Sequence, residues 1–122
     1  MPNTTNEKIL TDANAAIQRG DIEGFLRHCT ENTTWTFVGE RTLRGKEEVR
    51  RWMVEAYKEP PVFQVDRMLS GDDHVVALGQ ISIKNAEGKL VQHSYADAWL
   101  LRDGALAELR AFVISAPDGT VA

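Results

Sequence analysis

The 122-residue sequence has a single cysteine, no long apolar run and a polar N-terminus. One cysteine, Cys29, excludes an internal disulfide framework and is typical of a reducing compartment. No apolar stretch approaches the roughly 20 residues that cross a bilayer, and the polar start leads us to expect no signal peptide. We therefore expect a soluble, cytoplasmic protein that has no membrane partner.

Clustered positive charge is also missing. The chain carries 14 Lys and Arg against 18 Asp and Glu, a formal net charge of −4. Grooves that bind nucleic acid need clustered Lys and Arg. The one basic cluster, Arg50 and Arg51 with Lys46, alternates with Glu47 and Glu48, which is typical of a solvated helix face. The sequence thus predicts no nucleic-acid partner.

The motifs of several common sites are absent as well. No glycine-rich phosphate loop and no nucleophile elbow occurs. His28, His74 and His93 fall on separate predicted elements without ligand spacing, so no metal site is predicted. Cys29 has no obvious partner base and is expected to pack as a small hydrophobic residue. Because no repeat or low-complexity linker divides the chain, residues 1–122 are predicted to form one domain.

The first half of the chain is patterned for helices. Thr4 and Glu7 match a capping box, and apolar residues then recur at helical spacing up to Gly20, which ends the segment. Asp21 suits the N-cap of a short second helix that reaches Cys29. These features predict two consecutive helices before the first strand.

A strand, a loop and a third helix follow. Residues 33–38 alternate as a strand, residues 39–45 are expected to form a loop, and a helix with an apolar stripe runs from Lys46 to before Pro60. Gly79 indicates a bulge or bend that lets a long sheet curl. Four strands separated by turn residues are predicted at residues 62–70, 74–84, 90–101 and 105–115.

Helices followed by an antiparallel meander predict an α+β fold, in which N-terminal helices pack on a strongly curved antiparallel sheet. Such a sheet, closed by helices, encloses a cone, and a cone makes a pocket for a small hydrophobic ligand. On the last strand, Leu109, Ala111 and Val113 are expected to face inward.

Asp97 lies in a predicted strand that is otherwise aromatic and aliphatic. Because strand side chains alternate, Asp97 shares a face with His93, Tyr95 and Trp99. Burial raises the pKa of a carboxyl group, so Asp97 is predicted to act as general acid and base, or as a hydrogen-bond donor when neutral. The alternative is a structural carboxylate that is paired across the sheet.

Two neighbours of Asp97 are candidate catalytic residues. Tyr95 is placed to orient Asp97 or a ligand, although a core aromatic is an equal interpretation. His93 lies about 13 Å along the strand from Asp97, too far for a direct hydrogen bond. It either protonates a leaving group at the cavity mouth or is a solvent-exposed residue at the strand end. The residues predicted to line the substrate site are aromatic: Trp99, Trp35, Trp52, Tyr57 and Phe37.

Three segments carry a resemblance to a known superfamily: Gly20–Gly24, Trp35–Gly39 followed by Gly45 before a helix, and Asp97–Gly104. From about residue 7 to residue 112 the chain resembles the nuclear-transport-factor-2-like superfamily. Within it, the chain is similar to SnoaL-like polyketide cyclases and ketosteroid-isomerase relatives. The resemblance implies a conical α+β barrel with a hydrophobic cavity, no required cofactor, and a homodimer through the outer face of the sheet.

The resemblance also implies roles for particular positions. Asp97 matches the protonated acid that helps polarise a carbonyl in ketosteroid isomerases. The phenolic partner of that acid falls at Ala13 and the proton-shuttling aspartate at Thr36 or Phe37, and none of these side chains has the required chemistry. In the SnoaL branch, a single aspartate near the Asp97 position acts as acid and base in an aldol-type ring closure.

Two functions remain open on this basis. The first is a cofactor-independent isomerase, cyclase or lyase that acts on a hydrophobic carbonyl compound. The second is a non-catalytic module for ligand binding or dimerisation. The outward residues Ala96, Ala98 and Leu100 are expected to need cover, which suits a sheet-on-sheet contact as well as packing within the chain.

Overall fold

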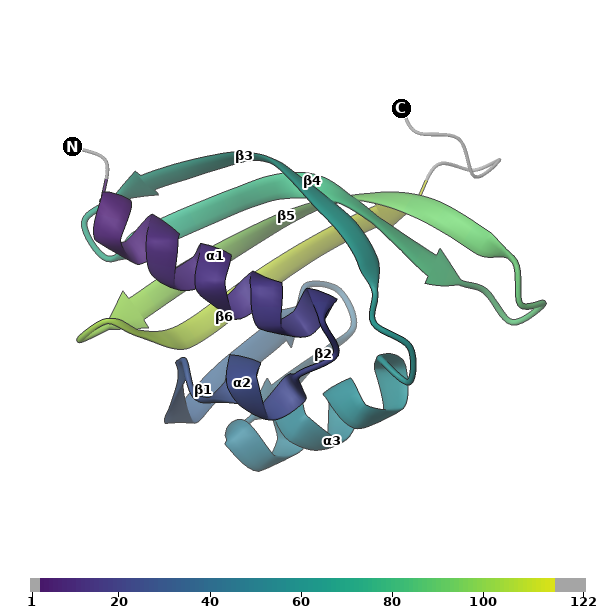
Figure 1. Ribbon diagram of the computed structural model, residues 1–122, viewed down its shortest axis with the longest axis horizontal. Helices are drawn as coiled ribbons and strands as arrows, with labels where there is room; N and C mark the ends of the chain where they lie inside the picture. Colours follow the sequence, from purple (N-terminus) through teal and green to yellow (C-terminus); the bar gives the residue numbers. More distant parts are fainter. Residues whose placement is uncertain (1–2, 116–122) are drawn as a thin grey trace.

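The computed structural model describes residues 3–115 and shows three helices laid against one side of a curved sheet (Figure 1). This confirms the predicted α+β cone: the sheet has six strands, is strongly curved and does not close on itself. The elements in chain order are α1 (Thr4–Gln18), α2 (Ile22–Leu26), β1 (Cys29–Phe37), β2 (Arg41–Arg44), α3 (Lys46–Ala56), β3 (Val62–Gly71), β4 (His74–Lys84), β5 (Leu90–Arg102) and β6 (Ala105–Ser115).

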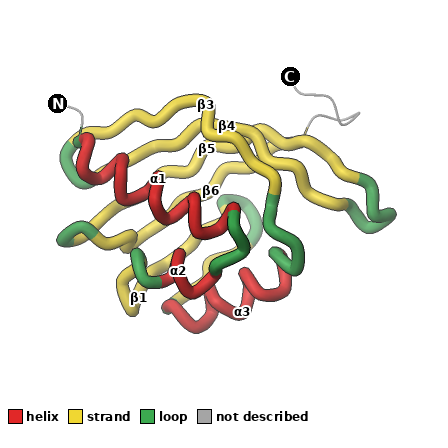
Figure 2. Tube along the Cα trace, in the orientation of Figure 1, coloured by secondary structure: helices red, strands yellow, loops and turns green. Residues whose placement is uncertain are grey.

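The strand order is β2-β1-β6-β5-β4-β3 (Figure 2). β3 to β6 form the predicted antiparallel meander. β1 joins this meander through a parallel pairing with β6, in which Trp35 lies opposite Leu109. β2 is an addition to the prediction, because residues 41–44 were expected in a loop but pair with the end of β1. The sheet is therefore mixed, and β1 brings its inward side chains next to those of β6.

The helix ends follow from short polar contacts. The N-cap of α1 lies one residue earlier than predicted, because the side chain of Asn3, and not of Thr4, accepts a hydrogen bond from the Asn6 amide at 3.1 Å. Asp21 caps α2 as predicted, accepting from the Gly24 amide at 2.8 Å. α2 is shorter than expected, and Cys29 already belongs to β1.

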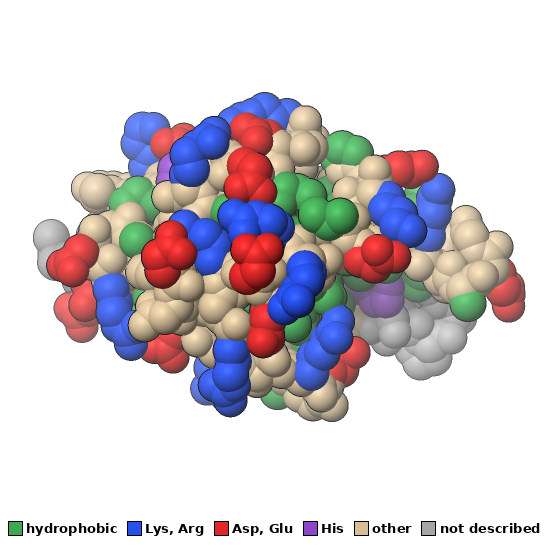
Figure 3. Space-filling view, turned by 90° about the horizontal axis from the view of Figure 1, so that it is seen from below, with side chains coloured by type: hydrophobic (Ala, Val, Ile, Leu, Met, Phe, Trp, Pro, Cys, Tyr) green, Lys and Arg blue, Asp and Glu red, His purple; other side chains and the backbone are tan. Residues whose placement is uncertain are grey.

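The helices cover the concave face of the sheet and bury their apolar stripes there. Leu10 and Ala13 of α1 and Val49 and Met53 of α3 are fully buried. The outer surface of α2 and α3 is covered by intermixed acidic and basic side chains (Figure 3), including Arg50, which bonds Glu23 at 2.7 Å. Among residues 3–115, no helix has both the length and the apolar character that crossing a membrane requires.

Gly79 marks the point where the sheet bends. It pairs with Val65 in β3, directly before a register shift that leaves Asp66 as the extra residue of a bulge. On its other side Gly79 pairs with Tyr95 of β5, whose side chain folds over it. A Cβ at Gly79 would lie 2.1 Å from the carbonyl oxygen of Gln64 and 2.7 Å from the Tyr95 hydroxyl oxygen. The missing side chain therefore permits both the bend and the position of Tyr95.

Gly79→Ala is expected to lower the free energy of unfolding by about 1–3 kcal/mol, because the backbone oxygen of Gln64 must move away from the new methyl group. Urea unfolding measures the change. Gly71→Ala is the matched control, since no atom lies within 4 Å of a Cβ there. Equal stability of the two variants would contradict the tight packing at Gly79.

Candidate functional site

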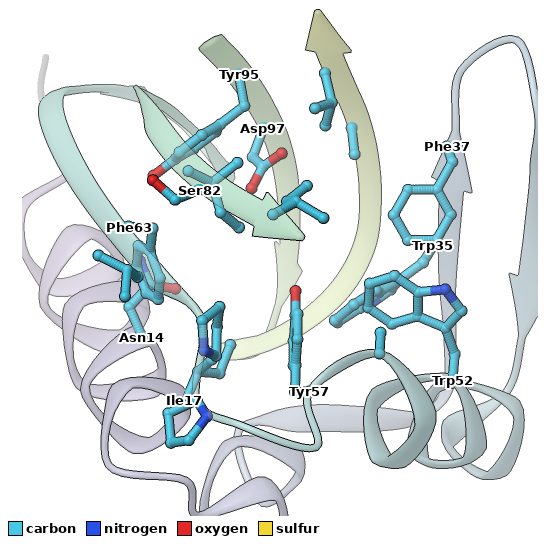
Figure 4. Close-up of a pocket in the computed structure, with 18 of the residues that line it drawn as sticks. Asn14, Ile17, Trp35, Phe37, Trp52, Tyr57, Phe63, Ser82, Tyr95 and Asp97 are labelled. Carbon is cyan, nitrogen blue, oxygen red and sulfur yellow. The ribbon is translucent and has the colours of Figure 1, made fainter. Parts of the chain in front are cut away.

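A cavity of about 600 Å³ lies between the concave face of the sheet and the helices (Figure 4). Its volume is within the range of small-molecule sites, and its walls are mostly apolar. Leu109, Ala111 and Val113 of β6 face it, as expected from alternation. The five aromatic residues predicted at the site all lie in its wall: Trp35, Phe37, Trp52, Tyr57 and Trp99.

Asp97 lies in β5, near the centre of the sheet, and its carboxyl group faces the cavity (Figure 4). Its two cross-strand neighbours are both small: Ala77 on β4 and Ala111 on β6. The adjacent inward position of β5 is occupied by Trp99, between Val75 and Leu109. The pair of alanines leaves open space around the Asp97 carboxyl group, whereas the larger neighbours of Trp99 close the base of the cavity.

The electrostatics of Asp97 are set by burial alone. Loss of water around the carboxyl group raises the pKa of Asp97 to about 7. Among the described residues, no hydrogen bond or salt bridge to its side chain is formed. Its side chain remains half-buried because the cavity itself admits solvent. Near pH 7, Asp97 is therefore present in both protonation states, which suits a group that takes and returns a proton.

Tyr57 is the polar group that faces Asp97 from the helical side. It follows α3 directly, and its amide donates to the carbonyl of Met53 at 2.8 Å, which fixes its backbone at the helix end. Pro60 and Pro61 cannot continue the helix, so the chain turns here into β3. The hydroxyl of Tyr57 points across the cavity toward Asp97 (Figure 4). Burial, and then the charge of Asp97, raise the pKa of Tyr57 above its ordinary value.

Tyr95 brings a second hydroxyl group to the same cavity. Its ring lies over Gly79, and its oxygen lies near Ser82 in the view of Figure 4. Burial, followed by the charges of Asp97 and Asp66, raises the pKa of Tyr95 to about 12. Tyr95 is consequently a neutral hydroxyl at physiological pH, able to donate one hydrogen bond to a ligand and accept others.

The aromatic residues of the wall stand nearly perpendicular to one another. Trp52 meets Tyr57 at 76° with centroids 5.3 Å apart, and it meets Trp35 at 65° and 6.0 Å. Trp35 in turn meets Trp99 at 86° and 5.7 Å. Edge-to-face contacts of this kind stabilise an aromatic cluster beyond the area that it buries.

The structure does not bring His93 to the cavity. The backbone of His93 pairs with Ile81 and Ser115, toward the end of the sheet, and His93 is not part of the cavity wall. Distance along the strand does not explain this, because Ile81, the partner of His93 on β4, and Leu90, farther along β5, both line the cavity. Cys29 is buried, and burial raises the pKa of its thiol to about 12, so it packs as the sequence indicates. Within residues 3–115, no group of three or more metal-binding side chains is assembled.

Several cavity residues were not identified from the sequence. Asn14 and Ile17 reach the cavity from the interior-facing side of α1, and Phe63 reaches it from β3. The helical stripe of α1 gave a signal for Ile17, but Asn14 interrupts that stripe and only the structure shows where it faces. Five charged residues also lie around the cavity: Glu40, Glu55, Lys58, Glu59 and Lys84.

The raised pKa of Asp97 predicts a cost in stability at high pH. The folded-state value of about 7 lies above the ordinary value of about 3.9, so the folded protein loses stability as pH rises between these values. The loss is at most about 4 kcal/mol, and less where water in the cavity screens the charge. Asp97→Asn, which stays neutral, is expected to become more stable relative to the wild type as pH is raised from 5 to 8.

Urea unfolding of both proteins at pH 5 and pH 8 checks this expectation. Asp73→Asn, at an exposed turn position, is the matched control and should follow the wild type. Parallel pH profiles of Asp97→Asn and the wild type would show that Asp97 is not desolvated.

Comparison with known proteins places these features in a family. The model of the SnoaL-like domain matches residues 10–109. An epoxide hydrolase/cyclase-like enzyme, SalBIII, with a role in pyran ring formation in the polyether salinomycin, is similar over 95% of this chain and 94% of its own, with 17% identity and a TM-score of 0.84. No curated protein matches the chain.

Two further solved structures share the fold. An epoxide hydrolase of M. tuberculosis aligns over 90% of this chain and 83% of its own, with 14% identity and a TM-score of 0.80. A putative SnoaL-like polyketide cyclase from Jannaschia sp. CCS1 aligns over 90% of this chain and 85% of its own, with 17% identity and a TM-score of 0.78. At these identities the likeness shows a common fold.

Proposed function

Since the chain belongs to the SnoaL-like domain family, we propose that it is a cofactor-independent isomerase, cyclase or lyase that uses Asp97 as acid and base on a hydrophobic carbonyl compound. One observation carries the proposal: a carboxyl group without a partner, whose pKa is raised to about 7, faces an aromatic cavity. Structural neighbours described as cyclases and epoxide hydrolases agree with acid–base chemistry in this fold.

The proton transfers follow from the placement of Asp97 and Tyr57. The Asp97 carboxylate takes a proton from the carbon next to the substrate carbonyl, and the C–H electron pair moves toward the carbonyl oxygen to form an enolate. The Tyr57 hydroxyl, which faces Asp97 across the cavity, donates a hydrogen bond to that oxygen. The enolate then has two outcomes, both of which restore the Asp97 carboxylate.

In the first outcome, the Asp97 proton returns to a different carbon of the conjugated system, and the product is an isomer. In the second, the enolate carbon attacks another carbonyl of the same molecule, and Asp97 protonates the new alkoxide as the ring closes. An acid with a pKa near the operating pH suits both steps, because it gives up and regains the proton at similar cost. Each sequence balances without a further reactant.

We expect Asp97→Asn to lower kcat by about 100-fold or more with a bicyclic β,γ-unsaturated ketone as substrate, because the amide cannot accept the proton. Absorbance of the conjugated product measures the rate. Tyr57→Phe should lower kcat and leave KM little changed, because its hydrogen bond strengthens as charge develops on the oxygen. His93→Ala is the control and should leave kcat unchanged, whereas a fall in kcat would favour the alternative in which His93 protonates a leaving group.

The second candidate is a binding module without turnover. It is favoured by the positions that correspond to the other catalytic groups of ketosteroid isomerases. Ala13 is fully buried in the core, and the Thr36 hydroxyl bonds Thr42 at 3.2 Å, away from the cavity wall. Phe37 lies in the wall but has no polar group. Ligand binding to wild type and Asp97→Asn alike, with no turnover of any carbonyl compound, supports this candidate instead.

We also propose a homodimer through the outer face of the sheet. The outward neighbours of the cavity residues form an apolar row across three strands, Leu78, Ala96 and Phe112, and Phe112 is 37% exposed. Leu69 and Ile114 lie on the same face and are 50% and 71% exposed. A contiguous apolar patch of this kind is typical of a protein interface.

Ala96→Glu is expected to convert a dimer into a monomer, because it places a charge at the centre of this face. Sedimentation velocity measures the mass of the particle. Ala15→Glu, at an exposed position of α1, is the matched control and should leave the dimer intact. A wild-type protein that sediments as a monomer at micromolar concentration would refute the proposed dimer.

A further inference from the structure

We propose that the cavity binds a hydrophobic ammonium ion, an N-alkylated arylalkyl amine whose protonated nitrogen lies against the Asp97 carboxylate among the surrounding rings. This ligand class goes beyond the proposed reaction and does not depend on turnover. Four observations support it: an unpaired acid in the cavity wall, a cluster of aromatic rings in the same wall, two hydroxyl groups able to accept a hydrogen bond, and a surplus of negative charge around the cavity.

The first observation is that Asp97 has no cationic partner. Among residues 3–115, no salt bridge to its carboxyl group is formed, and loss of water raises its pKa. A buried carboxylate in a protein is ordinarily paired with a cation or given hydrogen-bond donors. A ligand can therefore take the place of the missing partner, and an ammonium ion supplies both the charge and an N–H donor.

The second observation is the arrangement of the rings. Trp35, Trp52, Tyr57 and Trp99 all lie in the cavity wall and contact one another edge to face, at angles of 65° to 86°. A ring face attracts a cation, most strongly for tryptophan and more strongly where water is excluded. An alkylated ammonium gains from these faces, whereas a compact, strongly hydrated cation would lose its water without filling the space.

The third observation concerns the hydroxyl groups. Tyr57 and Tyr95 both interact electrostatically with Asp97, and neither hydroxyl group has a hydrogen-bond partner among the described residues. Each oxygen accepts as well as donates. An amine N–H that is not used by Asp97 therefore finds an acceptor, and a carbonyl ligand finds a donor, in the same place.

The fourth observation is the charge around the cavity. Lys58 is paired with Glu55 at 3.1 Å, and Lys84 with Glu59 at 3.4 Å. Glu40 forms no ion pair within residues 3–115, which leaves the charged residues around the cavity, apart from Asp97 itself, with one excess negative charge. The net charge of the chain, −4, has the same sign. Both attract a cationic ligand and disfavour an anionic one.

Two probes of equal shape test the proposal: N,N-dimethylbenzylamine and isobutylbenzene, in which a carbon replaces the nitrogen. All three tryptophans of the chain, Trp35, Trp52 and Trp99, lie in the cavity wall, so their fluorescence reports binding. At pH 8 the amine is expected to bind at least about tenfold more tightly than isobutylbenzene. Equal or tighter binding of isobutylbenzene, or no binding of either probe, would overturn the proposal.

Asp97→Asn distinguishes the contribution of the ion pair to binding from that of the aromatic rings. It is expected to weaken amine binding by about tenfold or more and to change isobutylbenzene binding by less than about twofold, because only the amine uses the charge. Tyr57→Phe keeps the ring and removes the hydroxyl, so it should weaken the amine less than Asp97→Asn does. An amine affinity that survives Asp97→Asn would overturn the assignment, and isobutylbenzene binding confirms that the variant is folded.

The pH dependence provides an independent readout. Because the ammonium ion binds the ionised carboxylate, its affinity should fall by up to about tenfold for each pH unit below 7, whereas isobutylbenzene should bind equally well or better. This contrast should vanish in Asp97→Asn. The proposed reaction is tested by the turnover of ketones, and the proposed ligand by its binding. The failure of one proposal can therefore be distinguished from the failure of the other. The titratable groups that face Asp97 or lie around its cavity are Tyr57, Tyr95, Glu40, Glu55, Lys58, Glu59 and Lys84.

Discussion

The carboxyl group of Asp97 is held in an apolar cavity without a charged partner, and the surrounding sheet keeps it there. Its cross-strand neighbours Ala77 and Ala111 are too small to cover it and have no polar group to bond it. A larger residue at either position would fill the cavity, and a donor there would lower the pKa of Asp97. The chemistry of the site therefore depends on two methyl groups as much as on the acid itself.

The curvature of the sheet helps to bring Tyr57 and Tyr95 to the cavity that Asp97 faces. The bulge in β3 opposite Gly79 bends the outer strands, and the side chain of Tyr95 occupies the space that Gly79 leaves. On the other side, α3 ends at the residue before Tyr57, and the two prolines that follow direct the chain into β3. The end of α3, the bulge in β3 and the central strand β5 thus place Tyr57, Tyr95 and Asp97 in one cavity.

The sequence predicted the parts of this arrangement that depend on local patterns. Alternation along β5 placed Asp97 and Tyr95 on one face, and alternation along β6 placed Ala111 inward, as the cavity wall shows. Trp99 was found in the same way, because it shares a face with Asp97. His93 shares the alternation of Asp97 but is not part of the cavity wall, although Leu90, farther along β5, is. Alternation therefore does not decide access to the cavity at this end of the strand.

What the sequence could not predict depends on contacts between distant segments. The parallel pairing of β1 with β6 joins residues more than 70 positions apart, and four-residue β2 has too few residues to show a period. The roles of Ala77 and Ala111 beside Asp97 could not be predicted either, because they depend on which residue lies opposite each alanine across the sheet. The N-cap at Asn3 was not predicted for a simpler reason, since Thr4 offers an equally good capping side chain one residue later.

The stability cost of Asp97 bears on the choice between a catalyst and a binding module. An asparagine of nearly the same shape would avoid the cost of a buried charge above neutral pH, and an alanine would suit the apolar wall. A buried acid without a partner is thus a poor structural element, which favours a role that uses its proton or its charge. Enolate chemistry uses the proton, and an ammonium ligand uses the charge. Both require the same empty space beside Asp97, and one cavity can serve both because Tyr57 and Tyr95 donate and accept with the same oxygen atoms.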